Sequence, residues 1–114
     1  VCYEPITQIV GGTPVTIDLK AKNQFMLTPE ELEAVLTDKS KILILSYPNN
    51  PTGGTMDREA LIKIADVVKK HDLLVISDEI YAELVYDEPF TSIAELPGMR
   101  ERTIVINGFS RALR

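Results

Sequence analysis

The chain has 114 residues, of which 45% are hydrophobic and 25% charged, and its net charge is −5. This balance is that of an ordinary globular protein, and the length suits one small domain with a core of its own. The negative charge argues against a nucleic-acid or anionic-membrane surface. No apolar run approaches the roughly 20 residues needed to span a membrane.

The start of the chain, Val1-Cys2-Tyr3, has no initiator Met and no basic or apolar region of a signal peptide. We therefore expect a piece of a longer protein, or one whose N-terminus has been removed. Cys2 is the only cysteine, which excludes an intrachain disulfide and fits a reducing, cytoplasmic compartment.

The first half of the chain predicts a strand, a helix and a second strand. Residues 14–19 are β-branched at three positions and follow a Gly-Gly turn, which predicts a short strand. Residues 28–31, Thr-Pro-Glu-Glu, form a capping box with Pro at the first helical position, so a helix is expected to run to about Thr37. The apolar run 42–45 predicts a strand buried on both faces, and it ends in the Pro/Asn/Gly-rich loop 47–54.

The second half predicts one longer helix between two strands. Asp57 is a plausible N-cap, and an apolar stripe follows at helical spacing, formed by Leu61, Ile64, Ala65 and Val68. Positive residues at 69–71 suit the end of that helix. Residues 73–76 and 103–106 predict two more strands, and a short helix or irregular segment is expected through Ala82.

Long crossovers between apolar strands indicate parallel pairing, in which ligands bind at the carboxyl ends of the strands. Asn50, Asp78 and the pair Ser110/Arg111 each come just after a predicted strand. We therefore expect the loops 47–54, 77–81 and 108–111 to share one edge of the sheet. An amide, a carboxylate and the phenol of Tyr81 at such an edge can grip a phenolic, cationic heteroaromatic ring.

Each of these side chains also has a purely structural interpretation. Asp78 could cap the short helix that follows it through the N–H groups of residues 80 or 81. Asn50 lies in a sequence of common turn formers, and Tyr81 could be a half-buried aromatic residue under a loop.

The combination Asn50-Pro51-Thr52-Gly53 and Asp78-x-x-Tyr81, each behind an apolar strand, resembles the class I/II aminotransferases, which are fold-type I pyridoxal-phosphate (PLP) enzymes. The resemblance covers the chain from Val1 to Arg111. It implies an α/β fold with a mostly parallel sheet and helices on both faces. Residues 1–114 would then be a single partial domain, the central part of the PLP-binding large domain.

The resemblance also implies roles for individual residues. Asp78 would pair with the pyridinium nitrogen of PLP and favour the protonated ring, the better electron sink. Asn50 and Tyr81 would hydrogen-bond the 3-hydroxyl oxygen, and Ser110 would contact the phosphate. Arg111 stands where the family has its catalytic Schiff-base lysine. Because a guanidinium stays protonated, we do not expect Arg111 to function there.

The implied activity of the parent protein is transamination between amino acids and 2-oxo acids, in a homo-oligomer. The family's phosphate loop and ring-stacking aromatic would precede Val1, and its carboxylate-binding arginine would follow Arg114. We therefore expect the chain alone to be inactive and to hold PLP poorly. Two alternatives remain: a PLP-dependent β-lyase or related enzyme, and a non-catalytic degenerate or excised α/β module, which Arg111 favours.

Other conspicuous residues are assigned structural or solvated positions. Tyr3 matches a position near the family's stacking aromatic, and Glu79 accompanies Asp78; both are expected to be structural. Tyr47 borders the pocket or packs in the core, and His71 is expected to be solvated. No residues have metal-ligand spacing.

Overall fold

The structure is a computed structural model that describes residues 2–85 and 89–108. Its strands are β1 (Ile42–Ser46), β2 (Leu74–Asp78) and β3 (Thr103–Ile106). Its α-helices are α1 (Tyr3–Ile9), α2 (Pro29–Val35) and α3 (Arg58–Lys70). Short 3-10 turns occupy Ala21–Asn23, Ala82–Leu84, Ile93–Glu95 and Arg100–Arg102.

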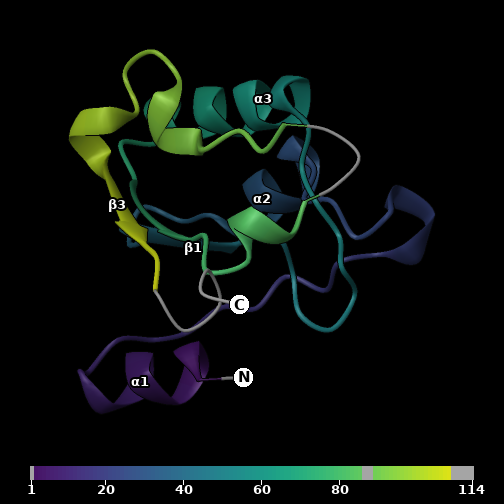
Figure 1. Cartoon of the computed structure of the whole chain (residues 1–114). Helices are drawn as coiled ribbons and strands as arrows, with labels where there is room; N and C mark the ends of the chain where they lie inside the picture. Colours follow the sequence, from purple (N-terminus) through teal and green to yellow (C-terminus); the bar gives the residue numbers. More distant parts are fainter. Residues whose placement is uncertain (1, 86–88, 109–114) are drawn as a thin grey trace.

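The three strands form one parallel sheet in the order β1-β2-β3, as the sequence predicts. The register pairs Ser46 with Asp78 and Asp78 with Ile106. The last residues of the three strands are therefore neighbours, and the loops that follow them leave from the same edge of the sheet (Figure 1).

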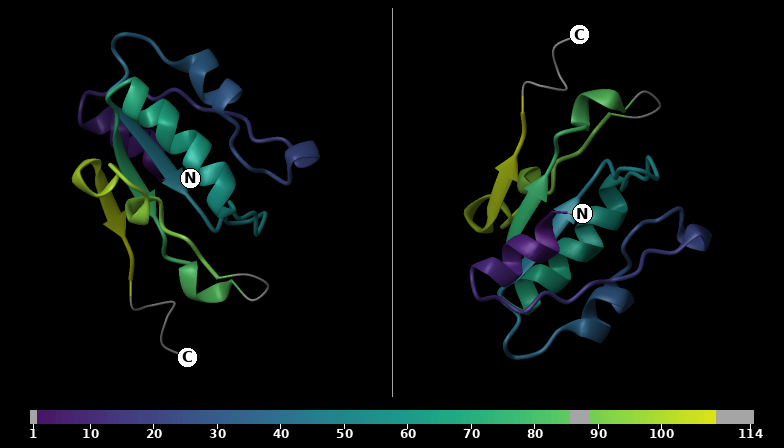
Figure 2. Two further views of the ribbon diagram at one scale, coloured as in Figure 1. Left: turned by 90° about the horizontal axis from the view of Figure 1, so that it is seen from above. Right: turned by 90° about the horizontal axis from the view of Figure 1, so that it is seen from below.

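Helices lie on both faces of the sheet, with α2 and α3 on one side and α1 on the other (Figures 1 and 2). The core lies between the sheet and α3. Val75 of β2 and the α3 residues Ile64 and Val68 are fully buried there. The apolar stripe predicted for the long helix is thus confirmed, because its members face the sheet while the charged residues face solvent.

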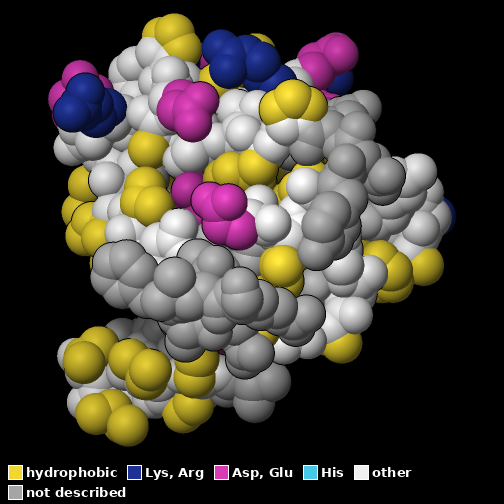
Figure 3. Space-filling view, in the orientation of Figure 1, with side chains coloured by type: hydrophobic (Ala, Val, Ile, Leu, Met, Phe, Trp, Pro, Cys, Tyr) yellow, Lys and Arg dark blue, Asp and Glu magenta, His cyan; other side chains and the backbone are white. Residues whose placement is uncertain are grey.

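The opposite face of the sheet is only partly covered. Ile42, Leu74 and Ile104 are 54%, 51% and 62% exposed. The prediction that the first strands are buried on both faces is therefore wrong for this face, because α1 leaves part of it open. Figure 3 shows hydrophobic side chains gathered over α1 and along β3.

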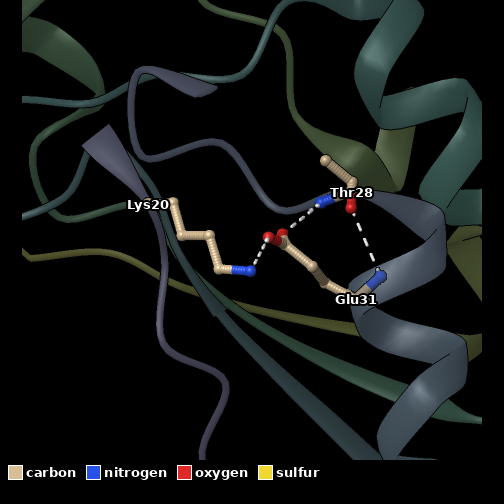
Figure 4. Close-up of polar contacts among 3 residues, drawn as sticks. All are labelled: Lys20, Thr28 and Glu31. Atoms are coloured by element: carbon tan, nitrogen blue, oxygen red, sulfur yellow. Dashed lines mark hydrogen bonds and ion pairs between the residues drawn. The ribbon is translucent and has the colours of Figure 1, made fainter. Parts of the chain in front are cut away.

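Local capping signals place the helix starts correctly. The Thr28 hydroxyl accepts a hydrogen bond from the Glu31 N–H at 3.2 Å, and the Glu31 carboxylate accepts one from the Thr28 N–H at 3.2 Å (Figure 4). Lys20 lies 3.8 Å from the same carboxylate. Asp57 caps α3 through a 2.7 Å bond from the Ala60 N–H. Helix α2 ends at Val35, two residues before the predicted end, because Leu36 adopts an extended conformation.

The strand predicted at 14–19 is wrong. This segment forms no ladder with any described strand. A strand needs a neighbour whose N–H and C=O groups match its own, and residues 14–19 pair with none of the three described strands. Strand β2 begins one residue later than predicted and runs two residues further, to Asp78, whereas β3 has the predicted bounds. Helix α1 is not predicted by any pattern identified in the sequence.

Candidate active site

Two of the predicted loops meet at the carboxyl edge of the sheet. The Asn50 side-chain amide donates a 3.2 Å hydrogen bond to the Tyr81 hydroxyl, which joins residues 31 positions apart. The loop that carries Asn50 is closed by backbone bonds from Asn49 to Gly54 (2.9 Å) and from Gly53 to Asn49 (2.7 Å). Gly53 has a φ of +70°, a conformation that favours glycine. The amide and the phenol are thus presented side by side.

Asp78 is the last residue of β2 and is half-buried. Its Oδ1 accepts a bond from the Ile80 N–H at 3.3 Å, and its Oδ2 accepts a bond from the hydroxyl of Tyr3. The first bond is the local one that the capping interpretation expects. The N-cap of the following 3-10 turn, however, is Tyr81, so Asp78 does not cap that turn.

Tyr3 reaches Asp78 from α1, 75 residues away in the sequence. Burial, the hydrogen bond to Asp78 and the negative charge of Asp78 all raise the pKa of the Tyr3 phenol above its ordinary value. The phenol therefore stays neutral and remains a donor to the carboxylate at ordinary pH. Only a structural role was expected of Tyr3, because no local pattern in the sequence links it to Asp78.

The neighbours of Asp78 point the other way. Because side chains alternate along a strand, Ser77 and Glu79 lie on the core side, where they are 6% and 5% exposed. Glu79 Oε1 accepts hydrogen bonds from the Ser77 hydroxyl (2.9 Å) and the Ser92 hydroxyl (2.6 Å). The structural role expected for Glu79 agrees with these bonds.

A shallow groove of about 220 Å³ lies beside the Asn50–Tyr81 pair. It is lined by both loops and by the end of the 3-10 turn, through Pro48, Asn49, Asn50, Pro51, Gly53, Thr55, Tyr81, Leu84 and Val85. Tyr47 does not line it. Its hydroxyl donates to Phe25 O at 2.7 Å and accepts from the Leu27 N–H at 3.1 Å, so Tyr47 belongs to the core.

The third predicted loop is described only at its start. Asn107 and Gly108 follow β3 at the same edge of the sheet. Ser110 and Arg111 lie outside the described residues. Within residues 2–85 and 89–108, no group of His, Cys, Asp and Glu could hold a metal ion. His71 ends α3 with its Nε2 3.6 Å from Glu33 Oε1, away from this edge.

Comparison with known proteins gives one consistent family. Residues 2–113 match the family model "Aminotransferase class I and II". YugH of Bacillus subtilis is 50% identical over 98% of this chain and 29% of its own length. The aspartate aminotransferase of Pyrococcus abyssi is 46% identical over 97% of this chain and 29% of its own length.

Solved structures agree. The aromatic aminotransferase from Pyrococcus horikoshii superposes with a TM-score of 0.95 at 45% identity, covering 99% of this chain and 31% of that one. The chain belongs to the class I and II aminotransferase family, whose enzymes are PLP-dependent. It spans about 29% of the length of the curated relatives that it matches, and its sheet corresponds to part of their large domain.

The polar groups at the end of β2 and in the loops after β1 and β2 are of the kinds that a PLP ring would need. A carboxylate held by two donors suits a cationic ring nitrogen. An amide and a phenol already within hydrogen-bonding distance of each other can both address one ring oxygen.

No described helix is long and apolar enough to cross a membrane.

Proposed function

We propose that this chain is the central part of the cofactor-binding large domain of a PLP-dependent aminotransferase. Residues 1–114 would be one partial domain of that protein. The protein would exchange an amino group between amino acids and 2-oxo acids, as a cytoplasmic homo-oligomer. The observation that carries the proposal is the Asn50–Tyr81 hydrogen bond, formed at the sheet edge where Asp78 ends β2.

Each residue has a defined task in this proposal. Bound PLP supplies an electron sink for the substrate α-carbon. Asp78 holds a proton on the ring nitrogen by opposite charge, while the bonds from Ile80 and Tyr3 fix the direction of its carboxylate. Asn50 and Tyr81 orient the ring by bonding its 3-hydroxyl oxygen. Ser110 would meet the phosphate.

One feature of the sequence favours a second candidate, a module that binds or associates without catalysis. Arg111 occupies the position of the family's reactive lysine, and a guanidinium supplies neither an amine nucleophile nor a base. A β-lyase would share the ring-binding residues proposed here, and substrate assays on the longer protein would separate it from an aminotransferase.

Pyridoxine 5′-phosphate tests the ring site in this chain. It carries the ring and phosphate of PLP but no aldehyde, so surface lysines cannot trap it. Because the chain alone is expected to hold PLP poorly, the ligand is titrated into the ¹⁵N-labelled chain up to millimolar concentrations. We expect it to shift the NMR signals of the Asn50 side-chain amide and of the Ile80 and Tyr81 amides. Asp78→Asn should raise the ligand concentration needed for half-maximal shifts by tenfold or more. Removing one partner of a buried charge pair costs about 3–5 kcal/mol, and the half-buried position of Asp78 reduces that cost.

Asp66→Asn is the matched control, because Asp66 is an exposed α3 carboxylate paired with Lys69 at 3.2 Å. It should leave the titration unchanged. Shifts that spread over other surfaces, or that survive unchanged in Asp78→Asn, would refute the proposed ring site.

A further inference from the structure

The turn between Asp78 and Tyr81 must keep its shape if the two side chains are to address one ring. This part of the inference rests on the proposed function. Asp78 is the last paired residue of β2, and Tyr81 lies outside the sheet. The residue between them that is most firmly held is Glu79, which the proposed reaction does not use.

All three polar groups of Glu79 are tied to different elements. Its N–H donates to Ile106 O at 2.8 Å, at the end of β3. Its carbonyl accepts from the Ala82 N–H at 2.9 Å, where the 3-10 turn begins. Its carboxylate accepts from the hydroxyls of Ser77 and Ser92.

The Ser92 contact reaches a separate part of the chain. Ser92 Oγ also accepts from the Ala94 N–H at 3.2 Å and so caps the 3-10 turn Ile93–Glu95. Ile93 is 2% exposed, so that turn is anchored in the core. The Glu79 carboxylate therefore connects the turn after β2 to a rigid point 13 residues further along the chain.

Burial makes this arrangement costly unless the carboxylate keeps its donors. Glu79 is 5% exposed, and none of the ion pairs among the described residues includes it. Two hydroxyl donors on one oxygen are the compensation that the structure offers. If Glu79 only filled space, an apolar side chain would do so without the cost of removing a carboxylate from water.

We propose that Glu79 is a positioning residue of the ring site: from the core side of the sheet it holds the turn that joins Asp78, on the other side, to Tyr81. Glu79 does not touch the ring. It acts through its own backbone, whose two hydrogen bonds are kept in place by the anchored carboxylate.

Amide hydrogen exchange tests this role without any ligand. Glu79→Met keeps the length of the side chain but removes the acceptor, and Glu79→Gln keeps an acceptor oxygen for both hydroxyls. In Glu79→Met we expect exchange of the Glu79, Ile80 and Ala82 amides to rise roughly tenfold to a hundredfold, the scale set by hydrogen bonds to a carboxylate. Exchange of the α3 amides should change by less than about threefold. Glu79→Gln should stay close to the original chain.

Ser77→Ala provides a milder variant that should fold even if Glu79→Met does not. Among the described contacts, the Ser77 hydroxyl bonds only Glu79, so this change removes one of its two donors. We expect a smaller rise at the same three amides. In either variant, unchanged exchange rates of the three turn amides would overturn the proposal. So would exchange rates that rise equally in α3 and in the turn.

The pyridoxine 5′-phosphate titration then connects the turn to the ring site. Glu79→Met should weaken the shifts at Asn50 and Tyr81, and Glu79→Gln should restore them. If the original chain shows no shifts even at millimolar ligand, the proposed ring site fails, whereas the exchange experiment still decides whether Glu79 holds the turn. Intact binding in a Glu79→Met chain whose turn has loosened would refute the positioning role.

Discussion

Tyr47→Phe removes a single oxygen atom that serves two backbone groups. Tyr47 follows β1 and is 8% exposed. Its hydroxyl donates to Phe25 O at 2.7 Å and accepts from the Leu27 N–H at 3.1 Å. These two bonds fasten the segment before α2 to the sheet. The substitution leaves the ring in place and opens no large cavity.

The expected loss follows from the two groups left behind. A buried donor or acceptor without a partner costs about 1–3 kcal/mol. Leu27 is buried and Phe25 is half-buried, so the N–H should cost more than the carbonyl. We expect the free energy of unfolding to fall by about 2–3 kcal/mol, a large share of the roughly 5–15 kcal/mol typical of a domain.

Urea unfolding at pH 7, followed by far-ultraviolet circular dichroism, measures this loss. The denaturant dependence should stay the same, since the surface exposed on unfolding does not change. Tyr81→Phe is the control, because its bond to Asn50 is exposed, and it should cost less than about 1 kcal/mol. A Tyr47→Phe loss below about 0.5 kcal/mol would show that the two backbone groups find other partners.

The same residue predicts an alkaline limit to stability. Burial raises the pKa of Tyr47 to about 12, from an ordinary value of 10.0. The folded state thus favours the neutral phenol. The stability that the neutral Tyr47 phenol contributes is fully present below pH 10. As the pH rises from 10 to 12 it is lost, and the free energy of unfolding falls by about 2–3 kcal/mol. Urea unfolding at several pH values should show a shallower decline for Tyr47→Phe, and equal slopes would contradict the assignment.

Three further predictions concern the site and the helix start. Asp78→Asn should lower the pKa of Tyr3, because the hydrogen bond and the charge of Asp78 account for part of its raised pKa. Titration of tyrosinate absorbance measures this pKa, and Tyr3→Phe identifies the Tyr3 signal. An unchanged Tyr3 titration in Asp78→Asn would disprove the coupling. Thr28→Ala should cost about 1 kcal/mol in urea unfolding by removing the α2 cap, with Thr28→Ser as the conservative control that should retain most of it. With PLP, an amino donor and 2-oxoglutarate, the chain should make no glutamate above a free-PLP control. Arg111→Lys should restore little, because the chain alone is expected to hold PLP poorly, and proximity and orientation commonly supply about 7–11 kcal/mol of catalysis. Enzyme-level turnover would overturn this expectation.

Patterns in the sequence predicted the elements that are set by interactions between residues close together in the chain. The caps at Thr28 and Asp57 are side-chain bonds to residues three positions away, so they can be read directly from spacing. The apolar runs likewise mark the positions of β1, β2 and β3, and the stripe of α3 marks the face that the helix buries. They do not report burial on both faces, since Leu74 of β2 and Ile104 of β3 are exposed. The strand predicted at 14–19 failed because a strand requires a partner, and β propensity within the segment does not supply one.

The order of strands and loops by itself determined that Asn50 and Asp78 leave the sheet at one edge, because parallel strands connected by crossovers share the direction of their carboxyl ends. Only the tertiary structure decided what those side chains contact. The bonds of Tyr3 to Asp78 and of Ser92 to Glu79 join residues 75 and 13 positions apart. Such bonds depend on how α1 and the turn Ile93–Glu95 pack against opposite faces of the sheet, and packing at a distance leaves no periodic pattern in the chain.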